Sequence, residues 1–154
     1  MRPDSGPDPG RGRTQIQPLY PLQTGGRFRN AGVERQIREL LSCGHAERLR
    51  RAGLTDIDVI EFVAEEALIY LVRHLMRANE PDAAMDLMEC LFKRCYNRIL
   101  RKVWALLPAC SRDDREDCAR SVLVEMTSLV QVTDAGKEFW EVNFTTCLER
   151  LCSN

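Results

Sequence analysis

Apolar residues recur at helical spacing along most of this sequence. In one stretch they fall at intervals that place them on one face of a helix: Ala119, Val122, Leu123, Met126, Leu129 and Val130. Similar spacing continues between residues 33 and 152, and no stretch bounded by turns alternates apolar and polar residues with a period of two. We therefore predict an all-α fold, a bundle of about five helices.

Two helices are predicted in the first half of this region. The first begins at Val33, and Gly44 is expected to weaken or bend its middle. The second spans 56–78 after a cap at Thr55. Its apolar face comprises Ile57, Ile60, Val63, Ala64, Ala67, Leu68, Leu71, Val72 and Leu75. A face of this width predicts burial between several neighbouring elements.

Three further helices follow. Pro81 suits the first position of a helix, and Pro108 ends that helix. Ser111 or Asp113 caps the next helix, whose first turn is rich in acidic residues. The last helix is expected over 136–152, after a turn.

The N-terminal part of the chain differs in composition. Residues 1–32 are rich in proline, glycine and arginine and hold few apolar residues that could offset the entropy of ordering them. We therefore expect a disordered tail over 1–32 and a single helical domain over 33–154.

Cysteine usage and charge restrict the location and the ligands of the protein. The chain has seven cysteines and no CxxC pair, so free thiols in a reducing, cytoplasmic location are expected. Cys43 and His45 have no second pair of ligands with zinc-site spacing, so we expect no metal and no cofactor. The formal net charge of −1 implies no general attraction to nucleic acid or to membranes.

The sequence lacks the common catalytic signatures. It contains no phosphate-binding loop, no dinucleotide fingerprint and no nucleophile elbow. Its two histidines, His45 and His74, have no evident partners for acid–base chemistry. No run of about 18 apolar residues is present, so no membrane span is expected. We predict a protein that is not an enzyme.

Residues 87–152 resemble region two of bacterial sigma factors of the extracytoplasmic-function type. Three segments carry the resemblance: LMECLFKRCYNRILRKVWALL (87–107), DREDCARSVLVEM (114–126) and EFWEVNFTTCLERL (138–151). The second is similar to the family's D-x-E-D-x-x-Q-E-x-F helix, and the third is placed like its Phe-x-x-Trp-Leu segment. The resemblance implies a bacterial helical domain that docks on a coiled coil of RNA polymerase and opens promoter DNA.

The resemblance also implies positions for the contacts. It places Asp117, Arg120 and Ser121 on the polymerase-docking face, although Arg120-Ser121 stand where the family has Gln-Glu. It places Phe139 and Trp140 where family members contact DNA, and these rings would stack on a flipped base. Their helical spacing favours two core aromatic residues over two DNA contacts. The helix that carries them holds more acidic than basic residues, which disfavours phosphate binding.

Two functions follow as expectations. The first is a non-enzymatic protein–protein interaction module on a sigma-like helical domain, acting as an adaptor or assembly subunit. Its partner, or a second copy of the chain, would bind the apolar faces between residues 33 and 78. The alternative is a sigma-like transcription initiation domain that binds core RNA polymerase and promoter DNA. A small-molecule or metal-dependent enzyme is a third hypothesis, which stoichiometric bound metal would favour.

Overall fold

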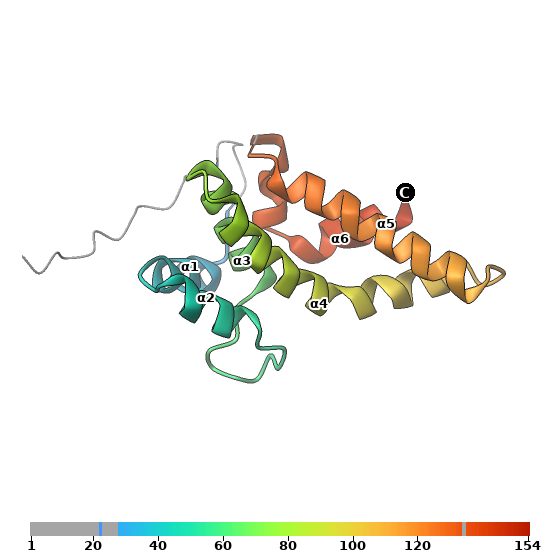
Figure 1. Ribbon diagram of the computed structural model, residues 1–154, viewed down its shortest axis with the longest axis horizontal. Helices are drawn as coiled ribbons and strands as arrows, with labels where there is room; N and C mark the ends of the chain where they lie inside the picture. The colour runs from blue at the N-terminus through green and yellow to red at the C-terminus, as the bar shows by residue number, and fades with distance from the viewer. Residues whose placement is uncertain (1–21, 23–27, 134) are drawn as a thin grey trace, which may run out of the picture.

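The computed structural model of the chain describes residues 22, 28–133 and 135–154. Within these residues it consists of helices joined by short connections, and no β-strand is found there (Figure 1). The elements are α1 (Ala31–Leu41), α2 (His45–Ala52), α3 (Glu65–Arg77), α4 (Pro81–Leu106), α5 (Arg112–Gln131), the 3-10 helix η1 (Ala135–Glu141) and α6 (Phe144–Ser153). The predicted all-α fold is confirmed.

Helix α3 lies at the centre of the fold. Every residue from Ala67 to Leu75 is buried, including the polar side chains of Arg73 and His74. The helix contacts α1, α4, α5 and η1, so it has neighbours on several sides. This surrounding explains the wide apolar face that the sequence shows in this region.

The junction between α3 and α4 is set by local backbone chemistry. Asn79 has a φ of 58°, in the left-handed region that asparagine tolerates better than most residues. The amide of Glu80 donates to the carbonyl of Leu75 at 2.9 Å, and the amide of Asn79 donates to that of Met76 at 3.2 Å. These are the two bonds of a Schellman motif. Helix α4 then begins at Pro81, as predicted.

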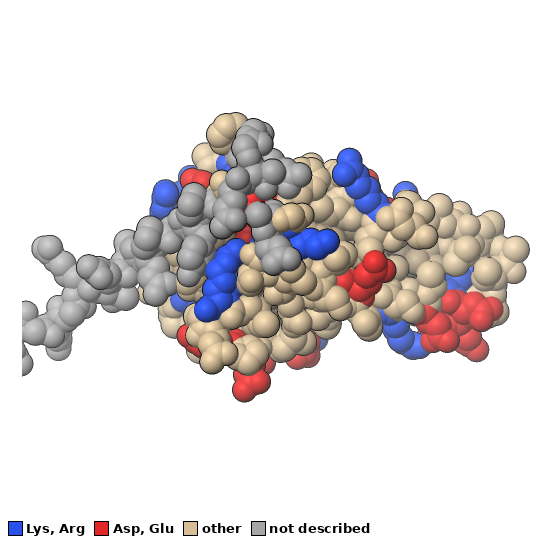
Figure 2. Space-filling model, turned by 90° about the horizontal axis from the view of Figure 1, so that it is seen from above, with Lys and Arg blue, Asp and Glu red and all other residues tan. Residues whose placement is uncertain are grey.

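Helices α4 and α5 are the two longest and lie side by side, with the turn that joins them at one end of the molecule (Figure 1). Ser111 is the N-cap of α5, and its side-chain oxygen accepts a hydrogen bond from the amide of Asp114 at 3.1 Å. The predicted core face of α5 is buried at Ala119, Val122, Met126 and Val130. Acidic side chains gather at the end of the molecule where α5 begins (Figure 2).

The first and last predicted helices are each divided in two. Gly44 is the N-cap of α2, so the expected weak point in the first helix is a complete break between α1 and α2. The region predicted as one helix over 136–152 consists of η1 and α6. Asn143 separates them, and its side chain accepts a hydrogen bond from the amide of Thr146 at 3.1 Å.

The second predicted helix begins later than expected. Residues 56–64 form a loop with single turns, and α3 begins at Glu65 with Ala64 as its N-cap. The prediction of a helix from 56, capped by Thr55, is therefore wrong. Side chains from α1 and α4 bind the backbone at the end of this loop and hold it out of the helix, as described below.

The predicted tail over 1–32 lies largely outside the described residues. Its last part, 28–32, is described and joins the folded body: α1 begins at Ala31, and the side chain of Asn30 accepts a hydrogen bond from the amide of Gly32 at 2.7 Å. The boundary of the folded part therefore lies N-terminal to Val33, because a capping residue and an ion pair from Arg29 precede it.

Candidate interaction surfaces

The loop 54–64 presents apolar side chains to solvent. Ile57 is 75% exposed and Ile60 is 97% exposed, and Val59 is also exposed. Acidic residues alternate with them at Asp56 and Asp58. In Figure 1 this segment extends from the body between α2 and α3. The loop combines exposed aliphatic side chains with negative charge, whereas an ordinary solvated loop exposes mainly polar side chains.

The two ends of this loop are fixed to the body. The guanidinium of Arg94 on α4 donates to the carbonyl of Ala52 at 2.8 Å and to that of Val63, and it lies 4.5 Å from the ring centroid of Phe62. Burial lowers the pKa of Arg94. The side chain of Gln36 on α1 accepts from the amide of Ala64 at 2.9 Å and donates to the carbonyl of Phe62 at 3.0 Å. The loop is therefore held in one conformation at its base.

Ion pairs and a short turn order the rest of the loop. The side chain of Asp56 accepts a hydrogen bond from the amide of Asp58 at 3.0 Å. Glu61 pairs with Arg50 of α2 at 2.8 Å, and the hydrogen bond from Arg50 lowers the pKa of Glu61. Exposed ion pairs of this kind add little stability, but here they restrict the loop around Ile60.

The residues predicted to contact polymerase lie together on the exposed face of α5. Arg120 pairs with Asp117 at 2.8 Å, and the hydroxyl of Ser121 donates to the carbonyl of Asp117 at 3.0 Å. Val124, one turn further on, is 68% exposed. The structure thus brings the three predicted residues onto one accessible surface beside an exposed apolar residue.

The two aromatic residues predicted as possible DNA contacts lie in η1. Trp140 is 6% exposed, and its ring packs against that of Phe144 with centroids 5.8 Å apart. Phe139 is half-buried, and the guanidinium of Arg150 lies 5.9 Å from its ring centroid. In this conformation Trp140 offers no open face to a base, which matches the alternative reading of a core aromatic.

A buried ionic cluster that the sequence did not reveal lies beside this region. Glu141 accepts from Arg29 at 2.6 Å and contacts Arg73 at 2.7 Å, and all three side chains are buried. Arg73 also donates to the carbonyl of Val132, and the guanidinium of Arg29 lies 5.0 Å from the ring centroid of Tyr70. The cluster joins the segment before α1 to α3, to the end of α5 and to η1. No local pattern signals it, because its members are far apart in sequence.

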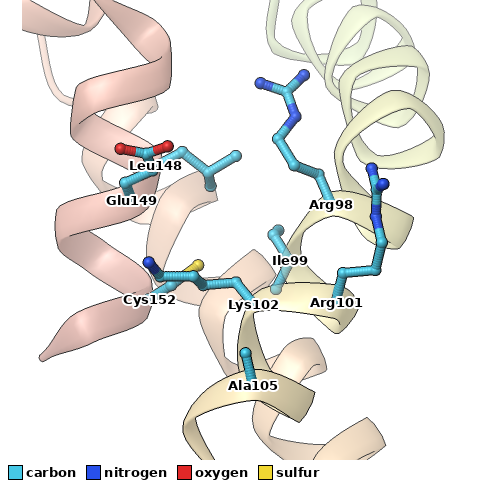
Figure 3. Close-up of a pocket in the computed structure, with 8 residues that line it drawn as sticks. All are labelled: Arg98, Ile99, Arg101, Lys102, Ala105, Leu148, Glu149 and Cys152. Atoms are coloured by element: carbon cyan, nitrogen blue, oxygen red, sulfur yellow. The ribbon is translucent and has the colours of Figure 1, made fainter.

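A groove between α4 and α6 forms the other main surface feature (Figure 3). Its volume is about 290 Å³, and its lining is mostly apolar, with Ile99 and Leu148 buried at its floor. Arg98, Arg101 and Lys102 border it from α4. Figure 3 shows Lys102 reaching across toward α6. An apolar floor with a basic rim suits an apolar group that carries negative charge.

Within the described part of the chain no cluster of three or more His, Cys, Asp or Glu side chains could hold a metal ion. His45, which the sequence places near Cys43, instead contacts Asp86 at 3.0 Å. No helix among the described residues has the length and apolar character needed to cross a bilayer.

Comparison with known proteins identifies no relative. No protein-family model matches the chain, no curated protein matches its sequence, and no solved structure matches its fold.

Proposed function

We propose that this protein is a non-enzymatic protein–protein interaction module, an adaptor or assembly subunit, and that it binds its partner through the loop 54–64. The observation that carries the proposal is the exposure of Ile57 and Ile60 on a loop whose base is fixed by Arg94 and Gln36. An ordered loop that keeps two isoleucines in water gains no core packing from them. Such exposure is typical of a binding site.

The fixed conformation of the loop favours binding to a protein. Because Arg94 and Gln36 restrain the backbone before a partner arrives, the entropy lost on association is smaller than for a free segment. The free thiols at all seven cysteines support a reducing, cytoplasmic location for this role.

The test is affinity purification of the tagged full-length chain from extract of its source cells. We expect the wild-type chain to retain a protein in stoichiometric amount and the double variant Ile57→Asp/Ile60→Asp to lose it. Both residues are exposed, so the variant should fold normally. The matched control is Val124→Asp, which places the same charge on an exposed apolar residue of α5.

The outcomes of this purification test both the loop contact and the proposed function. Loss of the partner in the loop variant and its retention in the control support the proposal. Equal recovery with both variants removes the loop from the contact. A wild-type chain that retains no protein overturns the proposed function.

A second candidate is a sigma-like domain that docks on RNA polymerase. The observation in its favour is the shared exposed face of Asp117, Arg120 and Ser121, with Val124 beside them. Recovery of RNA polymerase subunits with the wild-type chain, and their loss with Asp117→Ala, Arg120→Ala or Val124→Asp, would support this function. Recovery of no polymerase subunit would remove it.

A further inference from the structure

The rim of the groove between α4 and α6 holds two cationic side chains, Arg101 and Lys102, that no described acidic residue pairs with in a salt bridge. Arg98 pairs with Glu65 at 2.8 Å. Neither Arg101 nor Lys102 makes a salt bridge with any described residue, and Arg101 bonds only a backbone carbonyl, that of Asn97, at 3.4 Å. Glu149 is the one acidic residue among those that line the groove. A ligand that brings carboxylates to this rim would therefore gain charge pairing that is absent in the free chain.

The open shape of the groove suits side chains of a protein segment. Pockets for drug-sized ligands range from about 300 to 1,000 Å³. This groove has a volume of about 290 Å³, and it is open to solvent. Its residues on α4 run from Arg98 to Ala105, about two turns of helix or roughly 10 Å. That length suits a short segment that inserts one or two aliphatic side chains.

We propose that the loop 54–64 of a second copy of this chain docks in the groove. The inference rests on the proposed function, in which this loop is the binding element, and it names the partner. In the loop, Asp56 and Asp58 flank the exposed Ile57, and Ile60 follows. Two carboxylates beside exposed isoleucines match two cations beside an apolar floor.

The positions of loop and groove allow two copies to make this contact twice. Arg98 borders the groove, and it also borders a second cavity of about 450 Å³ that Ile57 lines at the base of the loop. Both features therefore adjoin the same stretch of α4. In a two-fold dimer the loop of each copy can contact the groove of the other. Both contacts are then satisfied within the dimer, so no larger assembly forms.

Nucleic acid is the competing ligand for a basic groove. Phosphate binding requires positive charge along the whole path of the backbone. Here Glu149 lies in the groove, and the acidic loop lies at its Arg98 end. The charge distribution therefore favours an acidic segment of protein.

The experiment is sedimentation velocity on the full-length chain over about a hundredfold range of concentration. The loop variant is Asp58→Arg, and the groove variant is Arg101→Glu/Lys102→Glu; Asp56 stays unchanged because it holds the turn in the loop. We expect the wild-type chain to associate reversibly. Each variant should associate about tenfold more weakly or worse, because like charges then face each other.

Charge exchange provides the control for misfolding. An equimolar mixture of the two variants, and a chain that combines all three substitutions, should both recover association, since opposite charges face each other again. Val124→Asp should associate like the wild type. Failure of the exchange to restore association would overturn the inference.

Further outcomes separate this inference from the proposed function. A wild-type chain that stays monomeric throughout the range overturns the inference. If the wild-type chain retains a different protein from extract and the double variant Ile57→Asp/Ile60→Asp loses that protein, the proposed function stands. Binding of a duplex DNA or RNA oligonucleotide that the groove variant loses, without self-association, would assign the groove to nucleic acid and overturn the inference.

Discussion

The carboxylate of Glu141 lies 2.7 Å from Nε of Arg73, and both side chains are buried. The second oxygen of Glu141 lies 2.6 Å from Arg29. The carboxylate of Glu141 thus contacts two buried guanidinium groups and joins η1 to α3 and to the segment before α1. A buried pair of this kind need not stabilise more than an apolar contact, but removal of one partner is costly.

The substitution Glu141→Gln tests this dependence. It keeps the shape of the side chain but removes the negative charge that two buried guanidinium groups contact, so we expect a loss of about 3–5 kcal/mol in the free energy of unfolding. Urea denaturation measures it, with Glu149→Gln on the exposed face of α6 as the control. A loss below about 1 kcal/mol would show that water or rearrangement compensates the charges.

Stability should depend on pH through His74. Burial, followed by the positive charges of Arg48 and Arg77, lowers the pKa of His74 from 6.5 in the folded protein, while Glu80 opposes this. The unfolded chain therefore binds a proton that the folded protein does not, and stability falls as the pH drops below about 6.5. Denaturation of wild type and His74→Gln between about pH 7.5 and 5.5 should show a smaller loss in the variant. Equal losses would assign the effect to other groups.

Helical spacing predicts a core residue at position 60, but Ile60 is exposed. We therefore expect the fold to tolerate a polar substitution there. Ile60→Asp should change the free energy of unfolding by no more than about 0.5 kcal/mol, as is usual on surfaces. Leu68→Ala, at a fully buried position of α3, should cost about 2–5 kcal/mol. Thermal and urea denaturation of the two variants provide the comparison. A large loss for Ile60→Asp would indicate that residues 56–64 are packed as a helix.

Arg94 should control the order of the loop. Arg94→Ala removes its bonds to the carbonyls of Ala52 and Val63, and we expect a loss of about 1.5–3 kcal/mol. Amides in 54–64 should also exchange faster with solvent than in the wild type. Arg94→Lys should rescue little, because an ammonium group cannot bond several carbonyls with the geometry of a guanidinium. Unchanged exchange in Arg94→Ala, measured against Arg101→Ala, would argue against this anchor.

The cysteines should differ in reactivity. Burial raises the pKa of the Cys95 thiol to about 12, whereas Cys110 is exposed. Alkylation depends on the thiolate and on access, so iodoacetamide should modify Cys110 first and Cys95 only after unfolding. Mass spectrometry of the native protein, with a urea-unfolded sample as the reference, measures the order. Early modification of Cys95 would mean that α4 opens locally.

Features whose causes lie within one or two helical turns could be predicted from the sequence. The spacing of apolar residues predicted an all-α fold and the buried face of α5 at Ala119, Val122 and Met126. Pro81 predicted the start of α4 because its ring suits a first helical position and its missing amide costs nothing there. The three predicted residues of the α5 face share one surface for the same reason, since helical geometry alone brings positions three and four apart together.

Features that depend on partners far apart in sequence arise only when the helices pack together. Residues 56–64 have helical spacing, yet Gln36 and Arg94, from α1 and α4, bind the backbone at the end of this segment and keep it a loop. Glu141 meets Arg29 across 112 positions of sequence, and Trp140 is buried because Phe144 and the body of the fold cover it. Helical spacing shows which residues share a face. Packing of the elements against one another decides which face becomes buried. It also decides whether the backbone bonds to itself or to a distant side chain, because those free energies arise only on packing.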